Sequence, residues 1–295
     1  MRSPLQRRVA CDPKPRLHPL KGEGDEQAPM NPADLLALYD DTMRKNAYVA
    51  GCLREQTATV SRYTTSTGSL SYIMWHDFVP ADAARIVDEE LRATQGHAKA
   101  LMWKLYAHGA APDALRAVLL DRGFAENDHC TLMMTPVDSL VRALAAIQSP
   151  AMNIQVRELV TAKELDAYQN IWDDVWPDAP NARYVDDYRV RIEQNDDGIV
   201  FFAGFAADDN PVTSGYLFHH PGQPIGLLCG GSTKAAWRRQ HAYTAMLAAR
   251  AHAALTRGVK FLATEAKPDS RPILERLGFM PLSTLAFYEK NVAAP

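Results

Sequence analysis

Three extended runs follow one another between residues 199 and 233, and they constrain the fold more than any other feature of the chain. Each is rich in β-branched and aromatic residues, which favour strands. The runs are IVFFAGFAA (199–207), VTSGYLFHH (212–220) and PIGLLCGGST (224–233). The turn sequences Asp-Asp-Asn-Pro and Pro-Gly-Gln-Pro separate them. We therefore expect an antiparallel meander.

The segments on both sides of the meander extend this pattern. Before it, NIQVRELV predicts a strand, and Thr161 with Glu164 forms a capping box that opens a helix. The remaining elements expected in this half are helices at 162–176 and 182–194, a long helix ending at Gly258, a strand at 259–266, a helix at 270–277 and a strand at 283–290. Such an order predicts an α/β fold (α+β) with a mixed sheet.

The first half of the chain echoes the second. In the first half DALRAVLLDRGF precedes HCTLMM, and in the second RPILERLGF precedes STLAFYE, so that a short helix ends at Gly-Phe before a strand in both. The elements expected in the first half are helices at 32–45, 80–95 and 112–122 and strands at 55–64, 69–77, 99–107 and 129–135. This echo favours a duplicated fold.

The length of 295 residues suits two domains. Residues 1–30 are rich in Pro, Gly and mixed charge and are predicted to form a disordered tail. An apolar helix from Val137 to Ile147 ends before Pro150. We therefore expect a first domain at 31–136, a helical linker at 137–151 and a second domain at 152–295.

Composition excludes several classes of protein. A net charge of −3 gives no reason to expect a nucleic-acid binder, so small molecules are the expected partners. The four cysteines lack the spacing of a zinc site or a disulfide framework, which predicts no metal and a cytoplasmic protein. No apolar run has the length of a membrane span, and no membrane partner is expected.

The loop after the third run has the features of an anion site. Gly230 to Thr233 end a strand, and a short basic loop, 234–239, leads into a helix whose first N–H groups lack partners. Arg238 and Arg239 add positive charge there, so a pyrophosphate would fit. The alternative is that the two arginines belong to a solvated helix start.

With the segments WRRQHAYTAMLAARAHAALTRGVKFLATEA and SRPILERLGFMPLSTLAFYEK in place, the chain resembles the GNAT superfamily of acyl-CoA-dependent N-acetyltransferases over about residues 152 to 292. The resemblance implies a splayed sheet that holds the pantetheine arm and a helix N-terminus that holds the pyrophosphate of acetyl-CoA. It implies cofactor contacts at Ser232, Thr233, Lys234, Arg238, Arg239, Gln240, His241, Ala242, Tyr243 and Thr244. The family has glycine or another small residue where this chain has His241 and Tyr243.

The resemblance also directs attention to catalytic groups. Glu265, near the end of strand 259–266, is the best-placed general base, with an exposed strand-end carboxylate as the alternative. His219 and His220 are the next candidates because histidine titrates near neutrality. Where the family often has a tyrosine as the general acid, this chain has Leu274. Tyr288 or a water molecule could supply the proton instead, and the alternative for Tyr288 is a place in the core.

In this family the helices before the meander shape the acceptor pocket. That segment mixes carboxylates with aromatic residues that suit a cationic amine, namely Trp172, Trp176, Tyr184 and Tyr188. The alternative is an amphipathic helix pair with its aromatic side chains in the core.

The first half resembles a degenerate GNAT-like domain. The residues before its helix at 80–95, from Phe78 to Asp82, contain no basic cluster and no glycine, and Asp82 would repel a phosphate. We therefore expect acetyl-CoA to bind only the second half.

These observations predict an N-acetyltransferase that moves an acetyl group from acetyl-CoA to a primary amine of a small molecule or peptide by direct attack. Backbone N–H groups around Ser232 and Thr233 would stabilise the oxyanion. The alternatives are a non-catalytic acyl-CoA-binding or regulatory module and a structural protein. A monomer or a homodimer is expected.

Overall fold

The computed structural model describes residues 30–49, 51–147, 154–178, 181–194 and 196–292. Most of the predicted tail, residues 1–29, and the predicted boundary at Ser149-Pro150 lie outside the described residues. Two compact units are present. Unit 1 contains the residues up to Leu105, Gly109–Glu126 and the segment from Phe287 onward, and unit 2 contains Tyr106–His108 and Asn127–Ala286.

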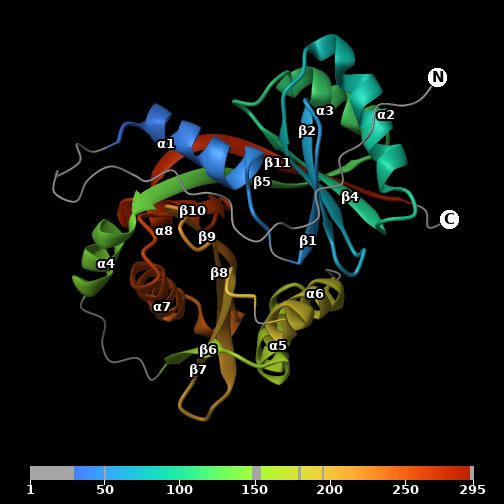
Figure 1. Cartoon of the computed structure of the whole chain (residues 1–295). Coiled ribbons are helices and arrows are strands. Elements are labelled where there is room, and N and C mark those ends of the chain that lie inside the picture. Colours follow the sequence, from blue (N-terminus) through green and yellow to red (C-terminus); the bar gives the residue numbers. More distant parts are fainter. Residues whose placement is uncertain (1–29, 50, 148–153, 179–180, 195, 293–295) are drawn as a thin grey trace. The chain divides into compact units, whose positions relative to one another are not determined.

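Unit 1 is a small sheet with helices (Figure 1). Its strands lie in the order β1-β2-β3-β4, followed by the end of β11. Its elements are α1 (Pro32–Tyr39), a π-helix (Asp40–Lys45), β1 (Cys52–Gln56), β2 (Val60–Thr65), β3 (Ser71–His76), a 3₁₀ turn (Pro80–Asp82), α2 (Ala83–Thr94), β4 (Ala100–Tyr106) and α3 (Pro112–Asp121).

Unit 2 contains the larger sheet, in which the first part of β11 (Met280–Asn291) is followed by β5-β10-β9-β8-β7-β6. Its remaining elements are β5 (Ala125–Pro136), α4 (Val137–Ala145), β6 (Gln155–Leu159), a 3₁₀ turn (Ala162–Glu164), α5 (Leu165–Val175), α6 (Asn181–Glu193), β7 (Ile199–Phe205), β8 (Pro211–His219), β9 (Ile225–Thr233), a 3₁₀ turn (Ala235–Trp237), α7 (Ala242–Thr256), β10 (Phe261–Ala266) and α8 (Arg271–Arg276).

Local sequence signals explain most of these boundaries. The capping box is present, because Thr161 Oγ1 accepts a hydrogen bond from the Glu164 N–H and the Glu164 side chain accepts one from the Thr161 N–H. Asn31 caps α1 in the same way and Pro32 occupies its first position. The three runs form the predicted antiparallel meander β7-β8-β9.

One predicted strand is wrong in the structure. The single strand expected at 55–64 is two strands, β1 and β2, joined at 57–59. Thr57 Oγ1 causes the reversal, because it accepts hydrogen bonds from the N–H groups of Thr59 and Val60 at 3.2 and 3.0 Å. A threonine hydroxyl that satisfies backbone donors competes with strand pairing.

The compact units also divide the chain differently from the predicted segments. β5, from the first half of the sequence, pairs antiparallel with β10 in unit 2, where Leu132 lies opposite Glu265. In return, β11 begins in unit 2 and its last part belongs to unit 1. α4, expected as a linker, buries Leu140 and Leu144 in the core of unit 2. The last strand of each half thus contributes to the other unit.

Helices cover both faces of the unit 2 sheet (Figure 1). On one face α7, α4 and α8 pack around Leu228, Met246 and Leu262. On the other face α5 and α6 pack their aromatic side chains against Phe201 and its neighbours in β7. Side chains on alternate residues of β9 and β10 therefore face two different environments.

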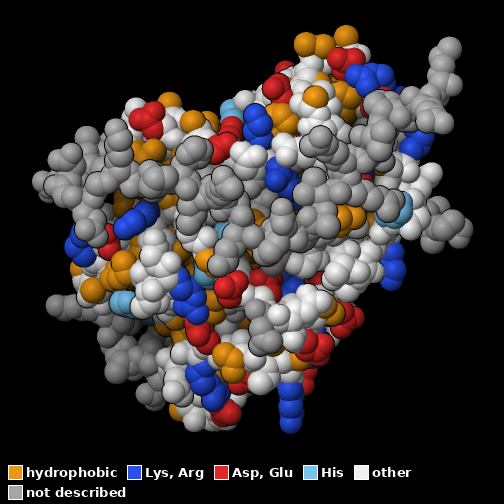
Figure 2. Space-filling model, in the orientation of Figure 1, with side chains coloured by type: hydrophobic (Ala, Val, Ile, Leu, Met, Phe, Trp, Pro, Cys, Tyr) orange, Lys and Arg blue, Asp and Glu red, His pale blue; other side chains and the backbone are white. Residues whose placement is uncertain are grey.

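Side chains of both charges are interspersed on the face of the molecule seen in Figure 2. Within the described ranges, no helix has both the length and the apolar character that crossing a membrane requires. No group of three or more His, Cys, Asp or Glu side chains in this part of the chain could hold a metal ion.

Candidate functional site

Strands β9 and β10 stop pairing in the middle of the unit 2 sheet. They pair in parallel from Ile225 opposite Phe261 to Leu228 opposite Thr264, yet β9 continues to Thr233. The N–H of Lys234 donates to Val212 O in β8 at 3.0 Å. Because backbone groups of a strand point alternately to its two sides, the N–H of Thr233 points away from β8. We call this region, 229–233 and the facing end of β10, the β9–β10 divergence.

Glycine is required where the divergence begins. Gly230 has φ +59°, and a Cβ there would lie 2.2 Å from Tyr168 Oη. The pairing of β8 with β9 shifts register at this point, between Ser214 and Tyr216. The result is a β-bulge, which re-aims the following backbone groups.

The loop into α7 retains the backbone shape of an anion-binding turn. Arg239 and His241 both have left-handed φ values, +58° and +62°. His241 is the N-cap of α7 and makes no capping side-chain hydrogen bond. Successive N–H groups in such a turn converge on one side, where they bind anions. The histidine therefore changes the side chain at the glycine position but keeps the left-handed conformation.

The polar side chains of this loop fix it to its surroundings. Lys234 Nζ donates to Asn170 Oδ1 on α5 at 2.7 Å, and Arg238 Nε donates to Thr233 O at 3.0 Å. Gln240 Nε2 donates to Ala236 O at 2.6 Å. The predicted cofactor residues, Ser232 to Lys234 and Arg238 to Thr244, thus lie together on the end of β9, the loop and the first turn of α7.

Arg250 lies beneath this region and was not predicted from the sequence. Its side chain is 2 % exposed, on the face of α7 that carries Met246 and Leu247. Nη1 donates to Cys229 O at 3.1 Å. A sequence signal existed, because this arginine interrupts the buried apolar stripe of an alanine-rich helix.

Glu265 is held by a tyrosine from the first half of the sequence. Tyr106 Oη donates to Glu265 Oε1 at 2.7 Å, and both residues belong to unit 2. Leu262 and Ala266 face the core beside α7. Side chains of a strand alternate between its two faces, so Glu265, which lies an odd number of residues from both, faces the opposite side. The predicted base therefore lies on the α5–α6 face of β10, beside the divergence.

The two histidines weighed as alternative bases lie at the wrong end of the sheet. His219 pairs with Gly226, at the start of β9, whereas Thr213 pairs with Thr233 at the divergence. Burial lowers the pKa of His219, and its Nε2 has no hydrogen-bond partner. His220 Nδ1 contacts Pro221 O. This placement sets His219 apart from the β9–β10 divergence.

Both positions considered for the acid have surroundings of their own. Leu274, at the position of the family's tyrosine, is buried in the core beside α7. Tyr288 belongs to unit 1, where Arg116 Nε donates to its hydroxyl at 3.1 Å. Burial raises the pKa of Tyr288, with a contribution from Glu126. The assignment of Tyr288 as the acid stays a prediction.

The predicted acceptor residues divide into core and surface. Trp172, Tyr184 and Tyr188 pack in the aromatic core between α5, α6 and β7. Trp176 is 40 % exposed, and its Nε1 donates to Ser232 Oγ at 3.1 Å. Lys267 Nζ lies 4.2 Å from the centre of the Trp176 ring. Only Trp176 of the four therefore combines an exposed face with contact to the divergence.

Unit 1 has the corresponding pair of parallel strands, but side chains fill the space between them. β3 and β4 pair from Ser71 opposite Leu101 to Ile73 opposite Trp103, although β3 runs on to His76. Trp103 Nε1 donates to His76 Nδ1 at 3.2 Å, and both side chains are buried. The other nitrogen, His76 Nε2, then carries the proton and donates to Ala110 O at 3.2 Å.

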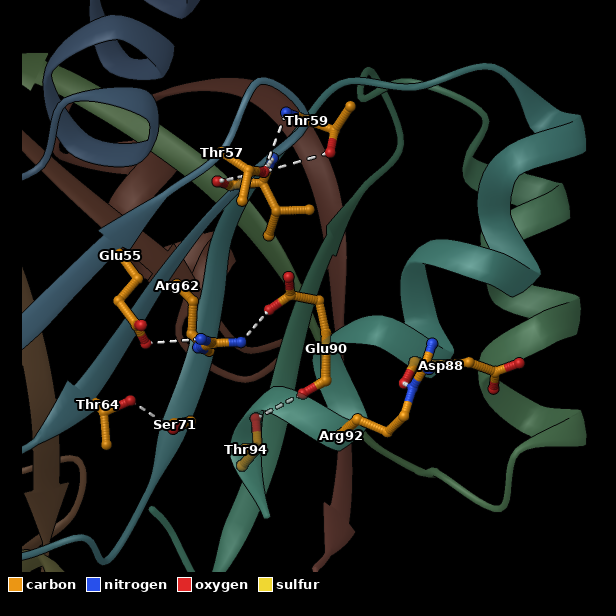
Figure 3. A network of polar contacts seen from close by, with 11 residues as sticks. Glu55, Thr57, Thr59, Arg62, Thr64, Ser71, Asp88, Glu90, Arg92 and Thr94 are labelled. Atoms are coloured by element: carbon orange, nitrogen blue, oxygen red, sulfur yellow. Dashed lines mark hydrogen bonds and ion pairs between the residues drawn. The ribbon is translucent and has the colours of Figure 1, made fainter. Parts of the chain in front are cut away.

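A buried ion pair also occupies unit 1 near its helix α2 (Figure 3). Arg62 on β2 contacts Glu90 on α2 and Glu55 on β1, each at 2.6 Å. Burial raises the pKa of Glu90, and the charge of Arg62 opposes that rise. At the start of α2, Asp82 pairs with Arg85 at 3.0 Å. The charges of this region therefore satisfy one another.

Comparison with solved structures identifies the architecture. The chain is similar to a conserved protein of unknown function from Staphylococcus epidermidis, with a TM-score of 0.63, 11 % identity and coverage of 84 % of this chain and 97 % of that one. It is similar to a GCN5-related N-acetyltransferase from Kribbella flavida, with a TM-score of 0.55, 16 % identity and coverage of 88 % and 93 %.

A third similar structure is a tandem GNAT protein from the clavulanic acid biosynthesis pathway, with a TM-score of 0.52, 13 % identity and coverage of 85 % and 86 %. The chain thus has the GNAT fold in a tandem arrangement, as predicted, with a mixed, mostly antiparallel sheet and flanking helices. No protein-family model and no curated protein sequence matches it.

Proposed function

We propose that unit 2 binds acetyl-CoA and transfers its acetyl group to a primary amine of a small molecule or peptide. The observation that carries the proposal is the β9–β10 divergence, which lies beside the left-handed turn at the start of α7. A diverging pair of strands leaves backbone N–H groups without a strand partner, and these suit the amide-rich pantetheine arm. The helix start and its arginines suit the pyrophosphate.

Direct attack requires the acceptor amine to be neutral. Glu265 would take the proton from the ammonium group, directly or through a water molecule, and Tyr106 would orient its carboxylate. The amine nitrogen would then attack the thioester carbonyl carbon. The N–H of Thr233 would stabilise the oxyanion that forms.

The acceptor would approach from the face on which Glu265 lies. Trp176 presents an exposed aromatic ring there, tied to Ser232 on β9. Aromatic faces attract cationic groups, and the ring already holds Lys267. An acceptor with a primary ammonium group would compete with Lys267 for this ring.

A non-catalytic acyl-CoA-binding module is the alternative function. The buried Leu274 favours it, because a leucine cannot protonate a leaving thiolate. The two functions agree on the binding of acetyl-CoA and differ in whether the thiol is released.

A thiol-release assay separates them. With acetyl-CoA and a panel of small amines and peptides, we expect release of CoA by the wild-type protein. Glu265→Gln should lower the rate by about 10²- to 10⁴-fold, the usual contribution of a general base. Glu275→Gln is the matched control, since Glu275 pairs with Arg271 at the exposed surface of α8. Full activity of Glu265→Gln would remove the base, and binding without release would favour the alternative.

A further inference from the structure

Within the part of the chain that the structure describes, no carboxylate pairs with the buried cation of Arg250. Among the described residues its hydrogen bonds go only to backbone oxygens, from Nη1 to Cys229 O at 3.1 Å and from Nε to Met246 O at 3.4 Å. The charged or ionisable groups close to it are Tyr243, Cys229 and Tyr168. Burial lowers the pKa of Arg250, because its surroundings disfavour the charge. A guanidinium nevertheless stays protonated in proteins.

The guanidinium points at the bulge in β9. A Cβ on Gly215 would lie 2.9 Å from Nη1, and one on Gly231 would lie 3.7 Å from Nη2. Because both residues are glycines, no side chain separates the cation from the backbone where the β9–β10 divergence begins. Tyr243 packs against Gly231, and its Cε2 atom lies 3.5 Å from the Cβ position of that residue.

An unpaired buried cation is expensive to keep, and a bound anion would compensate it. The pyrophosphate site proposed above already has the start of α7 and its exposed arginines. Arg250 lies two turns further along α7. A different anion, formed deeper in the divergence, is the natural partner of this cation.

We infer that Arg250 stabilises the sulfur of the thioester as it leaves in the form of a thiolate; this inference rests on the proposed function. The neutral amine nitrogen forms its bond to the carbonyl carbon and gives the tetrahedral intermediate. When this intermediate collapses, the carbon–sulfur bond breaks and its electron pair goes to the sulfur. Glu265, after passing the ammonium proton on to water, takes the second proton from the nitrogen. CoA departs as a thiolate paired with the guanidinium, so no acid is needed where this chain has Leu274.

The groups around Arg250 determine how this can be tested by pH. Burial raises the pKa of Tyr168 and Tyr216 well above the ordinary range and raises that of Tyr243, so burial favours the neutral form of all three hydroxyls. Glu265 on β10 is the carboxylate on the facing strand. Cys229 on β9 forms no disulfide among the described residues and is removed as a titrating group by Cys229→Ser.

The test uses CoA and S-methyl-CoA, which cannot form a thiolate. Both are titrated calorimetrically into the Cys229→Ser protein between pH 6.5 and 9.5, with Arg250→Met and Arg250→Lys in the same background. The affinity for CoA should rise at least about tenfold relative to S-methyl-CoA, because an opposite charge close by lowers a pKa by about 1 to 3 units. We expect this rise to vanish in Arg250→Met and to persist in part in Arg250→Lys.

Equal pH dependence of the two probes in the Cys229→Ser protein would overturn the inference, and so would an unchanged rise in Arg250→Met. If Arg250→Met does not fold, the comparison of the two probes on the arginine-containing protein decides alone. Failure of both probes to bind at any pH would contradict the proposed function itself. A failure to bind is thus distinct from binding that does not change with pH, which would overturn only the role of Arg250.

Discussion

Helices α2 and α7 each bury a charged residue at the same position in their pattern of buried residues. The two sheets differ in the groups that contact this residue. The buried residues Ile86, Val87, Glu90 and Thr94 of α2 have the same spacing as Met246, Leu247, Arg250 and Ala254 of α7. Glu90 meets an arginine on β2. Arg250 meets two glycines and the backbone of β9.

The two units therefore have similar folds but different surroundings for the buried charge. In unit 1 the buried charge is neutralised by Arg62, and the space after the paired part of β3 and β4 is filled by Trp103 and His76. In unit 2 the equivalent space has glycines, and the buried cation has no anion of its own among the described residues. We propose that unit 2, unlike unit 1, keeps the features needed for an anionic ligand.

The largest predicted effect concerns Trp103, whose indole is buried in unit 1. Trp103→Ala should lower the free energy of unfolding by about 3 to 5 kcal/mol, because a fully buried aromatic side chain leaves a cavity. Urea unfolding measures this, with the partly exposed Trp75→Ala as control. Acetyl-CoA affinity should stay unchanged below the unfolding transition. A loss of affinity in folded Trp103→Ala would mean that unit 1 takes part in binding.

The ion pair of unit 1 gives the next largest effect. Arg62→Met should cost about 3 kcal/mol or more, because Glu90 is left buried without its partner, whereas Arg62→Met/Glu90→Met should recover most of the loss. Urea unfolding of the single and double variants gives the coupling between them. Equal stability of the two variants would show that the pair is not energetically coupled.

The same pair predicts a pH dependence. The pKa of Glu90 is raised by burial above that of the unfolded chain, so protonation favours the folded state. The stability of the wild type relative to Glu90→Gln should therefore increase as the pH falls through the raised pKa toward the unfolded value, and decrease as the pH rises. An opposite slope in urea unfolding would mean that Arg62 outweighs burial.

A smaller loss is expected at the bulge of unit 2. Gly230→Ala should lower the free energy of unfolding by about 2 to 3 kcal/mol, because the residue has positive φ and its Cβ would meet Tyr168 Oη. It should also weaken acetyl-CoA binding, measured calorimetrically, by reshaping the divergence. Gly258→Ala is the control, since it has the same kind of φ but nothing within 4 Å of its Cβ. Equal acetyl-CoA binding by both variants would separate the bulge from the ligand.

The smallest effect concerns the histidine at the start of α7. His241→Gly should change stability by less than about 1 kcal/mol, because relief of the left-handed strain offsets the entropy of glycine in the unfolded chain. Acetyl-CoA affinity should be retained or improved. His252→Gly, inside α7, is the matched control and should only destabilise. A large loss of affinity in His241→Gly, measured by calorimetry, would show that the imidazole contacts the ligand.

Local signals predicted most elements of the fold, because capping, turn residues and strand composition act over a few residues. The capping box at Thr161 and the meander are examples. The exchange of β5 and β11 between the units was not predictable, since strand pairing over long sequence separations leaves no local mark. The turn at Thr57 was missed because a threonine hydroxyl favours either a strand or a turn, according to context.

The candidate site was predictable where it consists of consecutive residues. The loop between β9 and α7 lies where it was predicted, although the left-handed conformation of His241 was not foreseen. Its role in binding acetyl-CoA stays a prediction. Tyr106 was missed because it comes from the first half of the chain and reaches Glu265 only through the fold. Arg250 was missed because the sequence alone does not show whether a helix arginine faces solvent or the sheet.

The stoichiometry of acetyl-CoA binding decides whether unit 2 alone holds the ligand. Isothermal titration should give one molecule per chain, lost in Arg238→Ala/Arg239→Ala at the start of α7. It should be retained in Arg85→Ala, which removes an exposed arginine from the first turn of α2. Two molecules per chain, or unchanged binding in the double variant, would contradict the assignment of acetyl-CoA to unit 2 alone.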